Sequence, residues 1–261
     1  MDLGFSHPLK GQEFEIKKMS RFTLDILSIQ CKTFKFLKTN TLGVKMMDLH
    51  THTRFSDGIG YIRDNIAEAE RKGLRIVGIS DHIHFFTPHV LNSYLSLINR
   101  AKKESETIVL AGIEANILPE GVDITDDMRK RLDYVIASVH MYFNLGSHYK
   151  YLELVKAAIQ DENVDIIGHF GNVFPYIGYP SIEDYKEIVN LAEEYGKGFE
   201  ISARYRVPEL DFIKLCIKRG VKLVFGSDAH QPKDVGNINW SLKAFKKAGG
   251  KKEDLLFSEL L

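Results

Sequence analysis

Cysteine is scarce in this 261-residue chain, which holds only Cys31 and Cys216. Two cysteines do not make a disulfide framework or a cysteine-based zinc site, and so few suit a reducing compartment. No apolar run approaches the roughly 20 residues that a membrane-spanning helix needs. The first residues also lack the basic and then apolar pattern of a signal peptide. We therefore expect a soluble cytoplasmic protein that has no membrane partner.

The chain also lacks an excess of charge of either sign, because 35 lysines and arginines balance 35 aspartates and glutamates. Nothing global therefore attracts it to nucleic acid, although a local basic patch is not excluded. Hydrophobic residues make up 44% and charged residues 27% of the chain, as in an ordinary globular protein. Nucleic acid is thus a partner that the charge does not indicate.

Residues 1–45 differ from the rest of the chain. They carry basic residues among scattered aromatic residues and do not join the repeating pattern that follows. We expect residues 1–45 to form an N-terminal extension, either disordered or the product of a misassigned start, with the natural start then at Met46 or Met47. Residues 46–261 are expected to form the folded barrel domain.

From residue 45 onward, short apolar runs alternate with amphipathic stretches, which is typical of βα units. The expected strands are Val44–Leu49, Leu74–Ile79, Thr107–Ile113, Asp133–Ser138, Val164–Gly168, Gly198–Ile201 and Val221–Phe225. The expected helices lie near 61–72, 90–104, 125–131, 149–160, 181–195, 207–219 and 238–248, and Gly73, Gly196 and Gly220 are expected to end three of them. Seven such units favour a closed or nearly closed barrel, with a doubly wound open sheet as the alternative.

All but one of the expected strands end on side chains that suit a metal ion. His50 and His52 lie two residues apart where the first strand runs into a loop, so in extended backbone they point to the same side. Asp57 follows on the loop. The carboxyl ends of the strands meet on one face of a parallel barrel, so these side chains are expected to converge there. The later strands end on His82, Glu114, His140, His169, Asp228 and His230.

Imidazole and carboxylate ligands without thiolate suit zinc, manganese or iron(II). Nine candidate ligands exceed the four that a zinc ion typically takes. A carboxylate bridges two ions readily, and a pair of ions stabilises both the attacking and the leaving oxygen of a displacement. The sequence therefore predicts two or three divalent ions and a hydrolytic reaction.

The motifs resemble those of the polymerase and histidinol phosphatase (PHP) superfamily, in particular its stand-alone metal-dependent phosphoesterases. The resemblance covers residues 47 to about 248, with the motifs in order. Its motifs are Asp48-Leu49-His50-Thr51-His52, Ser56-Asp57-Gly58, Ser80-Asp81-His82, Gly112-Ile113-Glu114, Ser138-Val139-His140, Gly168-His169 and Gly226-Ser227-Asp228-Ala229-His230.

This resemblance implies an α/β fold, a distorted (β/α)₇ TIM-like barrel with a trinuclear metal site at the C-terminal ends of the strands. It assigns one ion to His50, His52, Glu114 and Asp228, a second to Glu114, His140 and His169, and a third to Asp57, His82 and His230. Of these, we expect Glu114, Asp228 and His230 to be catalytic.

Some polar side chains outside these motifs are further candidates. Arg204, after the sixth strand, and Arg54, within the first loop, are candidates for binding substrate phosphate, because a guanidinium binds phosphate through two hydrogen bonds. Asp81 is expected either to orient His82 or a water molecule or to cap the following turn. His84 and His89 are expected to be surface residues, with the entrance of the site as the alternative.

The predicted activity is hydrolysis of a phosphomonoester, of a nucleotide or a small molecule, by attack of a metal-bound hydroxide. Histidinol phosphate is one candidate substrate. The first alternative is an exonuclease or DNA-end-processing phosphoesterase, which the neutral charge disfavours. The second is a metal-dependent C–N hydrolase, which is disfavoured because Glu114 stands where such enzymes typically have a lysine.

Overall fold

The computed structural model describes residues 47–140 and 145–261. The expected extension over residues 1–45, with the question of its start, lies outside the described residues and stays a prediction. No helix in the described ranges is long and apolar enough to cross a membrane.

The described strands form one sheet with the order β1-β2-β3-β5-β6-β7-β8, and β4 pairs with β3 beside this path. All pairs along the path are parallel, while β3 and β4 are antiparallel. The strands are Met47–Asp48 (β1), Ile76–Ile79 (β2), Ile108–Leu118 (β3), Gly121–Val122 (β4), Tyr134–Ser138 (β5), Ile166–Ile167 (β6), Gly198–Ser202 (β7) and Leu223–Gly226 (β8).

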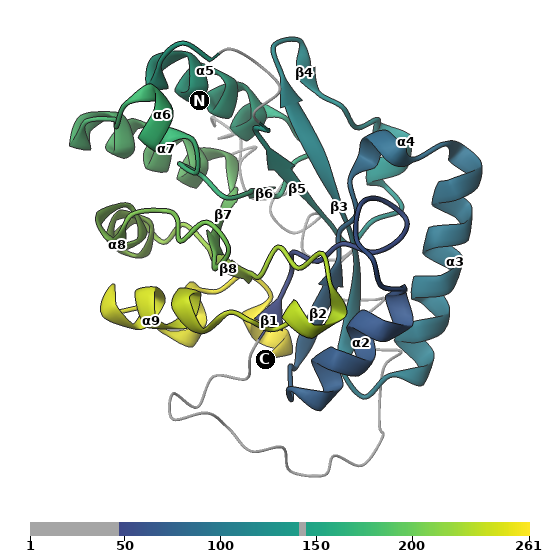
Figure 1. Cartoon of the computed structure of the whole chain (residues 1–261). Helices are drawn as coiled ribbons and strands as arrows, with labels where there is room; N and C mark the ends of the chain where they lie inside the picture. Colours follow the sequence, from purple (N-terminus) through teal and green to yellow (C-terminus); the bar gives the residue numbers. More distant parts are fainter. Residues whose placement is uncertain (1–46, 141–144) are drawn as a thin grey trace, which may run out of the picture. The chain divides into compact units, whose positions relative to one another are not determined.

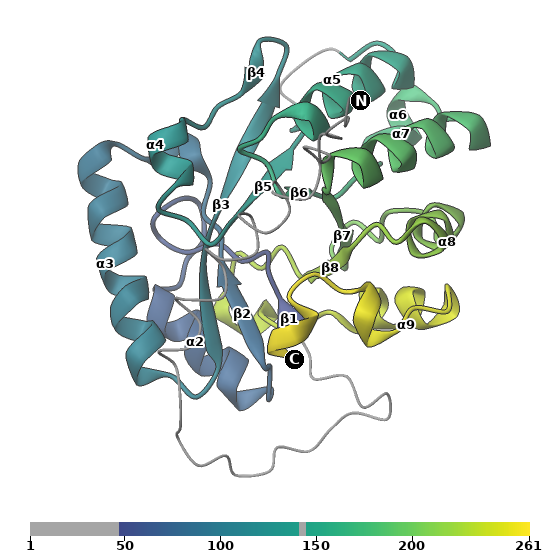
Figure 2. The ribbon, with the colours of Figure 1, turned by 180° about the vertical axis from the view of Figure 1, so that it is seen from behind.

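Helices alternate with these strands and lie outside the sheet, with α2 and α3 beside β2 and β3 (Figure 1). The view from behind shows α5, α7, α8 and α9 along the other half of the sheet (Figure 2). The α-helices are Ile62–Arg71 (α2), Pro88–Glu104 (α3), Asp126–Arg129 (α4), His148–Gln160 (α5), Phe174–Ile177 (α6), Ile182–Tyr195 (α7), Leu210–Arg219 (α8) and Asn239–Lys247 (α9).

Helix α7 shows why these segments are helical. Ser181 and Asp184 form a reciprocal capping box at its start, and Gly196 ends it in the left-handed conformation. Its buried side chains, which include Ile188 and Val189, lie at helical spacing and face the sheet. Gly73 and Gly220 follow α2 and α8 with positive φ, so all three glycines end helices as the sequence predicts.

The first and last strands of the path close the sheet. Leu49 N donates to Phe225 O at 2.9 Å, and His52 N donates to Ala229 O at 2.8 Å. Thr51 and Ala229 form a parallel bridge just beyond the ends of β1 and β8. The sheet is therefore a nearly closed seven-stranded barrel, which confirms the predicted TIM-like (β/α)₇ fold and excludes the open doubly wound sheet.

Tyr134 fills the barrel interior below the mouth. Its side chain is fully buried, and a Cβ atom added at Gly78 or Gly112 would collide with its ring. Glycine at these two strand positions leaves the space that the ring occupies. The interior is thus a packed core that supports the residues at the mouth from beneath.

The third strand differs from the prediction, which ended it at Ile113 with Glu114 at its tip. β3 continues to Leu118, because Asn116 pairs with Ser138 of β5 and Ile117 pairs with Val122 of β4. Glu114 therefore lies within a strand, and the β3–β4 hairpin extends beyond the mouth. Neither β4 nor the short helix α6 is predicted from the sequence.

Candidate metal centre

The paired histidines of the first motif are held at the barrel mouth by the residue between them. Thr51 Oγ1 donates to Gly78 O at 2.7 Å, and Thr51 N donates to Ser80 Oγ at 3.1 Å. These bonds fix Thr51 toward β2, so His50 and His52 both point into the mouth, where their side chains are buried. The alternation predicted from the sequence therefore holds just past the end of β1.

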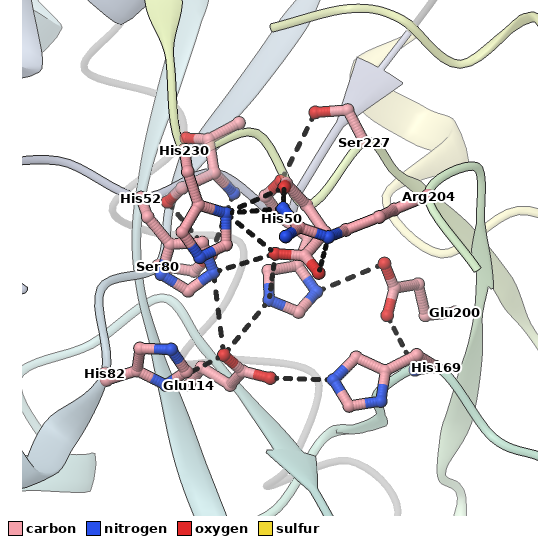
Figure 3. A network of polar contacts seen from close by, with 12 residues as sticks. His50, His52, Ser80, His82, Glu114, His169, Glu200, Arg204, Ser227 and His230 are labelled. Carbon is pink, nitrogen blue, oxygen red and sulfur yellow. Dashed lines mark hydrogen bonds and ion pairs between the residues drawn. The ribbon is translucent and has the colours of Figure 1, made fainter. Parts of the chain in front are cut away.

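Glu114 lies at the centre of the site and is 1% exposed. Its two carboxylate oxygens face five imidazoles from four different parts of the barrel. Figure 3 labels four of these, those of His50, His52, His82 and His169. The distances are 3.2 Å to His50 Nε2, 3.6 Å to His52 Nε2, 3.0 Å to His82 Nδ1, 3.3 Å to His140 Nε2 and 3.1 Å to His169 Nε2.

Two further carboxylates complete the cluster. Asp228 Oδ1 lies 3.2 Å from His52 Nε2. Asp57 Oδ2 lies 3.0 Å from His230 Nε2 and 3.7 Å from His82 Nε2. The structure thus brings together all nine residues that the sequence predicts as metal ligands.

Donor atoms within 4.8 Å of one another form three groups that suit a metal ion. The groups share members, so they lie side by side. They are His52, Asp57, His82 and His230; His50, His52 and Asp228; and His82, Glu114 and His140. The resemblance implies a different grouping. Here His82 also joins Glu114 and His140, His52 also joins the group of Asp57, and Glu114 belongs to one group only. His169 is in none of the three groups, although its Nε2 lies 3.1 Å from Glu114 Oε1.

The surroundings of the buried ring nitrogens at the centre of the site suit bound metal ions. His50 Nε2, both ring nitrogens of His52, and His82 Nδ1 are buried and have no hydrogen-bond partner among the described residues. Carboxylate oxygens lie 3.0–3.6 Å from these atoms, but not in hydrogen-bond alignment. Leaving such groups unpaired is costly, and divalent ions between nitrogen and carboxylate would pair them.

The electrostatics of the site favour charge separation in the absence of metal. Burial opposes charge on Glu114, but the imidazoles around it hold the pKa of Glu114 well below its usual range. Burial likewise opposes charge on His82, but Asp57 and Glu114 raise the pKa of His82 to about 10. The carboxylates thus stay ionised and ready to bind cations.

Metal binding is therefore expected to release protons near pH 7.5. The pKa of His82 lies above its usual 6.5 in the folded protein, so this imidazole is protonated there and must lose the proton to bind an ion. The same proton stabilises the metal-free fold below pH 6.5, and this contribution is lost as the pH rises through about 10.

Calorimetric titration of metal-free protein with Mn²⁺, in buffers of different ionisation enthalpy, measures these protons. The heat should depend on the buffer, and His82→Asn should release fewer protons than the wild type. The same heat in every buffer would contradict the expectation.

Two of the nine residues have unusual backbone conformations. His169 has φ 26° and Asp228 has φ 52°, values that residues other than glycine seldom adopt. His169 N donates to Glu200 Oε2 at 2.7 Å, and this bond holds the turn in place. Such strain is concentrated at functional sites, where the surroundings fix the side chain in one position.

Glu200 is a buried member of the site that lies outside the sequence motifs. It lies on β7, and its Oε1 accepts from His50 Nδ1 at 3.1 Å, which leaves His50 Nε2 to face Glu114. Gly226 makes room for this contact, because an added Cβ would collide with Glu200 Oε1 and with His50 Cβ. The available signal was a carboxylate between the apolar Phe199 and Ile201 on a buried strand.

Asp81 holds the loop that carries Asp57. Its carboxylate accepts from Thr53 N at 2.7 Å, from Thr53 Oγ1 at 2.8 Å and from Ser56 Oγ at 2.6 Å. The sequence predicts that Asp81 either orients His82 or a water molecule or caps the turn after Asp81. The hydrogen bonds show neither role, because the carboxylate of Asp81 caps the loop that follows β1. Asp57 is thereby held although it is 42% exposed.

The two predicted substrate-binding arginines lie in different surroundings. Arg204 Nη1 donates to Asp228 O at 3.0 Å and lies 2.9 Å from His230 Nδ1, so this half-exposed guanidinium borders the cluster. Arg54 is exposed and lies over the ring of Tyr61, 5.4 Å from its centroid. Arg204 therefore lies beside Asp228 and His230 of the cluster, whereas Arg54 contacts Tyr61.

The profile of the PHP domain family matches residues 48–204 of the chain, which include seven of the nine clustered residues. The chain belongs to the PHP domain family. This confirms the resemblance seen in the sequence.

Curated relatives agree with the PHP assignment. A probable phosphatase of Thermoanaerobacter sp. (strain X514) is 35% identical over 219 residues, which is 78% of this chain and 86% of that protein. The DNA polymerase/3'-5' exonuclease PolX of Bacillus subtilis (strain 168) is 29% identical over 227 residues, 82% of this chain but 39% of that protein.

Among solved structures, a histidinol phosphate phosphatase from Lactococcus lactis, in complex with zinc, L-histidinol and phosphate, has the same fold. Its TM-score is 0.63 at 24% identity, and the match covers 79% of this chain and 95% of that one. The family match and these relatives together show that this PHP protein is a hydrolase that acts on phosphate esters. It carries residue clusters suited to metal ions.

Proposed function

We propose that this PHP protein is a metal-dependent phosphomonoesterase that acts on a small phosphorylated molecule. The position of Glu114 supports this most directly, because one buried carboxylate faces five imidazoles at 3.0–3.6 Å. A carboxylate with two oxygens suits a position between two ions. The share of the chain that matches relatives named phosphatases supports the same reaction class.

The nine clustered residues would hold two or three divalent ions, zinc, manganese or iron(II). Bound there, the ions would acidify a water molecule and bind phosphate oxygens. Glu200 orients His50, and Asp81 holds the loop of Asp57, so protein groups already position these donors. The ligand set proposed is His50, His52, Asp57, His82, Glu114, His140, His169, Asp228 and His230.

Of the three proposed catalytic residues, Glu114 would hold ions through its two oxygens, and Asp228 faces the paired histidines. The side chain of His230 is 25% exposed, so it is open to a substrate from solvent. Arg204 lies next to both Asp228 and His230, so its guanidinium is placed to contact a phosphate oxygen. Arg54 remains a weaker candidate for that contact.

Histidinol phosphate is one candidate substrate, because the Lactococcus lactis protein of the same fold was solved with histidinol and phosphate. The relative named PolX, a 3'-5' exonuclease, supports DNA ends as a second candidate. The balance of charge in this chain favours the small molecule.

Phosphate release tests the two candidates side by side. Metal-free protein would be supplied with manganese or zinc and given p-nitrophenyl phosphate, histidinol phosphate, nucleoside monophosphates and a labelled oligonucleotide. We expect metal-dependent phosphate release from at least one monoester and no shortening of the oligonucleotide. Shortening without phosphate release would favour the exonuclease, and no reaction with metal bound would contradict both.

A further inference from the structure

Asn116 joins the candidate metal centre to the hairpin that extends β3. It lies two residues beyond Glu114 on the same face of the strand, and it is 7% exposed. Its side-chain amide contacts three groups: the carboxylate of Asp123 and the rings of His140 and His84. Neither Asn116 nor Asp123 is among the nine clustered residues.

The carboxylate of Asp123 sets the direction of this amide. Asp123 Oδ1 accepts from Asn116 N at 2.6 Å, and Asp123 Oδ2 accepts from Asn116 Nδ2 at 2.6 Å. A carboxylate only accepts hydrogen bonds, so the NH₂ of Asn116 must face Asp123 and its Oδ1 must face the other way. The hydrogen bonds therefore determine which end of the amide is oxygen.

This direction determines where His140 carries its proton. Asn116 Oδ1 lies 2.8 Å from His140 Nδ1, and because the oxygen only accepts, Nδ1 must donate. The lone pair of neutral His140 is then on Nε2, which lies 3.3 Å from Glu114 Oε1. A metal ligand that binds through Nε2 requires this tautomer.

The second hydrogen of the same NH₂ determines the opposite tautomer for His84. Asn116 Nδ2 lies 3.2 Å from His84 Nδ1, so that nitrogen accepts and the proton of neutral His84 is on Nε2. His84 is exposed, and its ring centroid is 5.2 Å from that of His82 within the cluster. His84 thus presents an N–H donor beside the ion positions.

We propose that Asp123 and Asn116 form a positioning pair that holds His140 as a lone-pair donor to a metal ion and His84 as an N–H donor to the substrate. The role of His84 rests on the proposed phosphomonoesterase function, whereas the role of the pair toward His140 needs only metal binding. The side-chain amide of Asn116 thus fixes opposite tautomers of His140 and His84.

The first arm of the test measures metal affinity without any substrate. Asp123→Asn keeps the shape of the side chain but adds a donor, so the amide of Asn116 is no longer held in one direction. We expect the affinity for Co²⁺, followed by visible absorption and by competition with a chelator, to fall by about 10- to 100-fold. The exposed Asp127→Asn, on α4 close by in the sequence, is the matched control and should bind like the wild type.

The second arm measures KM and kcat for p-nitrophenyl phosphate. His84→Ala should raise KM by about 10-fold, the loss of one hydrogen bond to a charged group, with metal content unchanged. His84→Gln, which restores an N–H donor, should recover part of the loss. His89→Ala, an exposed histidine in the first turn of α3, should leave both constants unchanged.

Each arm has a result that overturns its part of the proposal. Wild-type Co²⁺ affinity in a folded Asp123→Asn protein would overturn the positioning pair. Wild-type KM in His84→Ala, or an equal change in His89→Ala, would overturn the substrate contact. If the wild type with bound metal releases no phosphate, the proposed function fails and the role of His84 with it, while the first arm still decides on the pair.

Discussion

Replacing Glu114 with glutamine should lower kcat/KM for metal-dependent phosphate release by roughly 1,000-fold or more. That is a loss of about 4 kcal/mol or more of transition-state stabilisation. The change keeps the shape of the side chain but removes the charge that five imidazoles face. A neutral amide has one accepting oxygen and an NH₂ that repels cations, so it does not connect two ions. Phosphate release at saturating Mn²⁺, together with metal content per chain, measures the effect.

The control for this variant is Glu183→Gln. Glu183 is exposed in the first turn of α7, and its ion pair with Lys186 lies within that helix. Such a surface pair contributes little to stability, so activity and metal content should match the wild type. A folded Glu114→Gln protein with wild-type activity would refute the central position assigned to this carboxylate.

Removing the metal should lower the thermal stability of the barrel by a large margin. An ion that binds only the folded state stabilises it by about 4 kcal/mol when its concentration is 1,000 times Kd. For a domain of 150–250 residues, that corresponds to a fall in Tm of about 8–16 °C. The buried ring nitrogens that lack partners among the described residues would be left unpaired again, which adds to the loss.

Calorimetric scans with a chelator, and then with Mn²⁺ or Zn²⁺ added back, measure this change. His52 belongs to two of the three groups of donor atoms, so His52→Asn should reduce the difference between the two scans. The same Tm with and without chelator, for protein shown to lose its metal, would mean that the ions do not stabilise the fold.

The order of strands and helices could be predicted because each follows from a local pattern. Apolar runs mark the strands, and Gly73, Gly196 and Gly220 end the helices where only glycine adopts the backbone conformation at no cost. The β3–β4 hairpin could not be predicted in this way. Its second strand has only two residues, Gly121 and Val122, and an alternating pattern does not exist at that length.

The nine clustered residues could be predicted because a parallel barrel brings the ends of its strands to one face. Asp81 could be singled out because it precedes His82 in a motif. Two other residues that orient the ligands, Glu200 and Asn116, could not, because their partners lie far away in the sequence. Glu200 contacts His50 across 150 residues, and nothing local to either residue indicates the contact. The contacts of Asn116 are equally hard to predict, because His84 lies 32 residues before it and His140 lies 24 residues after it.

The closure of the barrel between β1 and β8 also affects when the protein binds metal during its synthesis. His50 and His52 leave the ribosome long before Asp228 and His230, by about 10 to 40 seconds at ordinary translation speeds. An ion captured in that interval lacks the donors of the last strand, so it is held weakly and exchanges. We expect the barrel to choose its metal after β8 has docked, from the ions present where folding is completed.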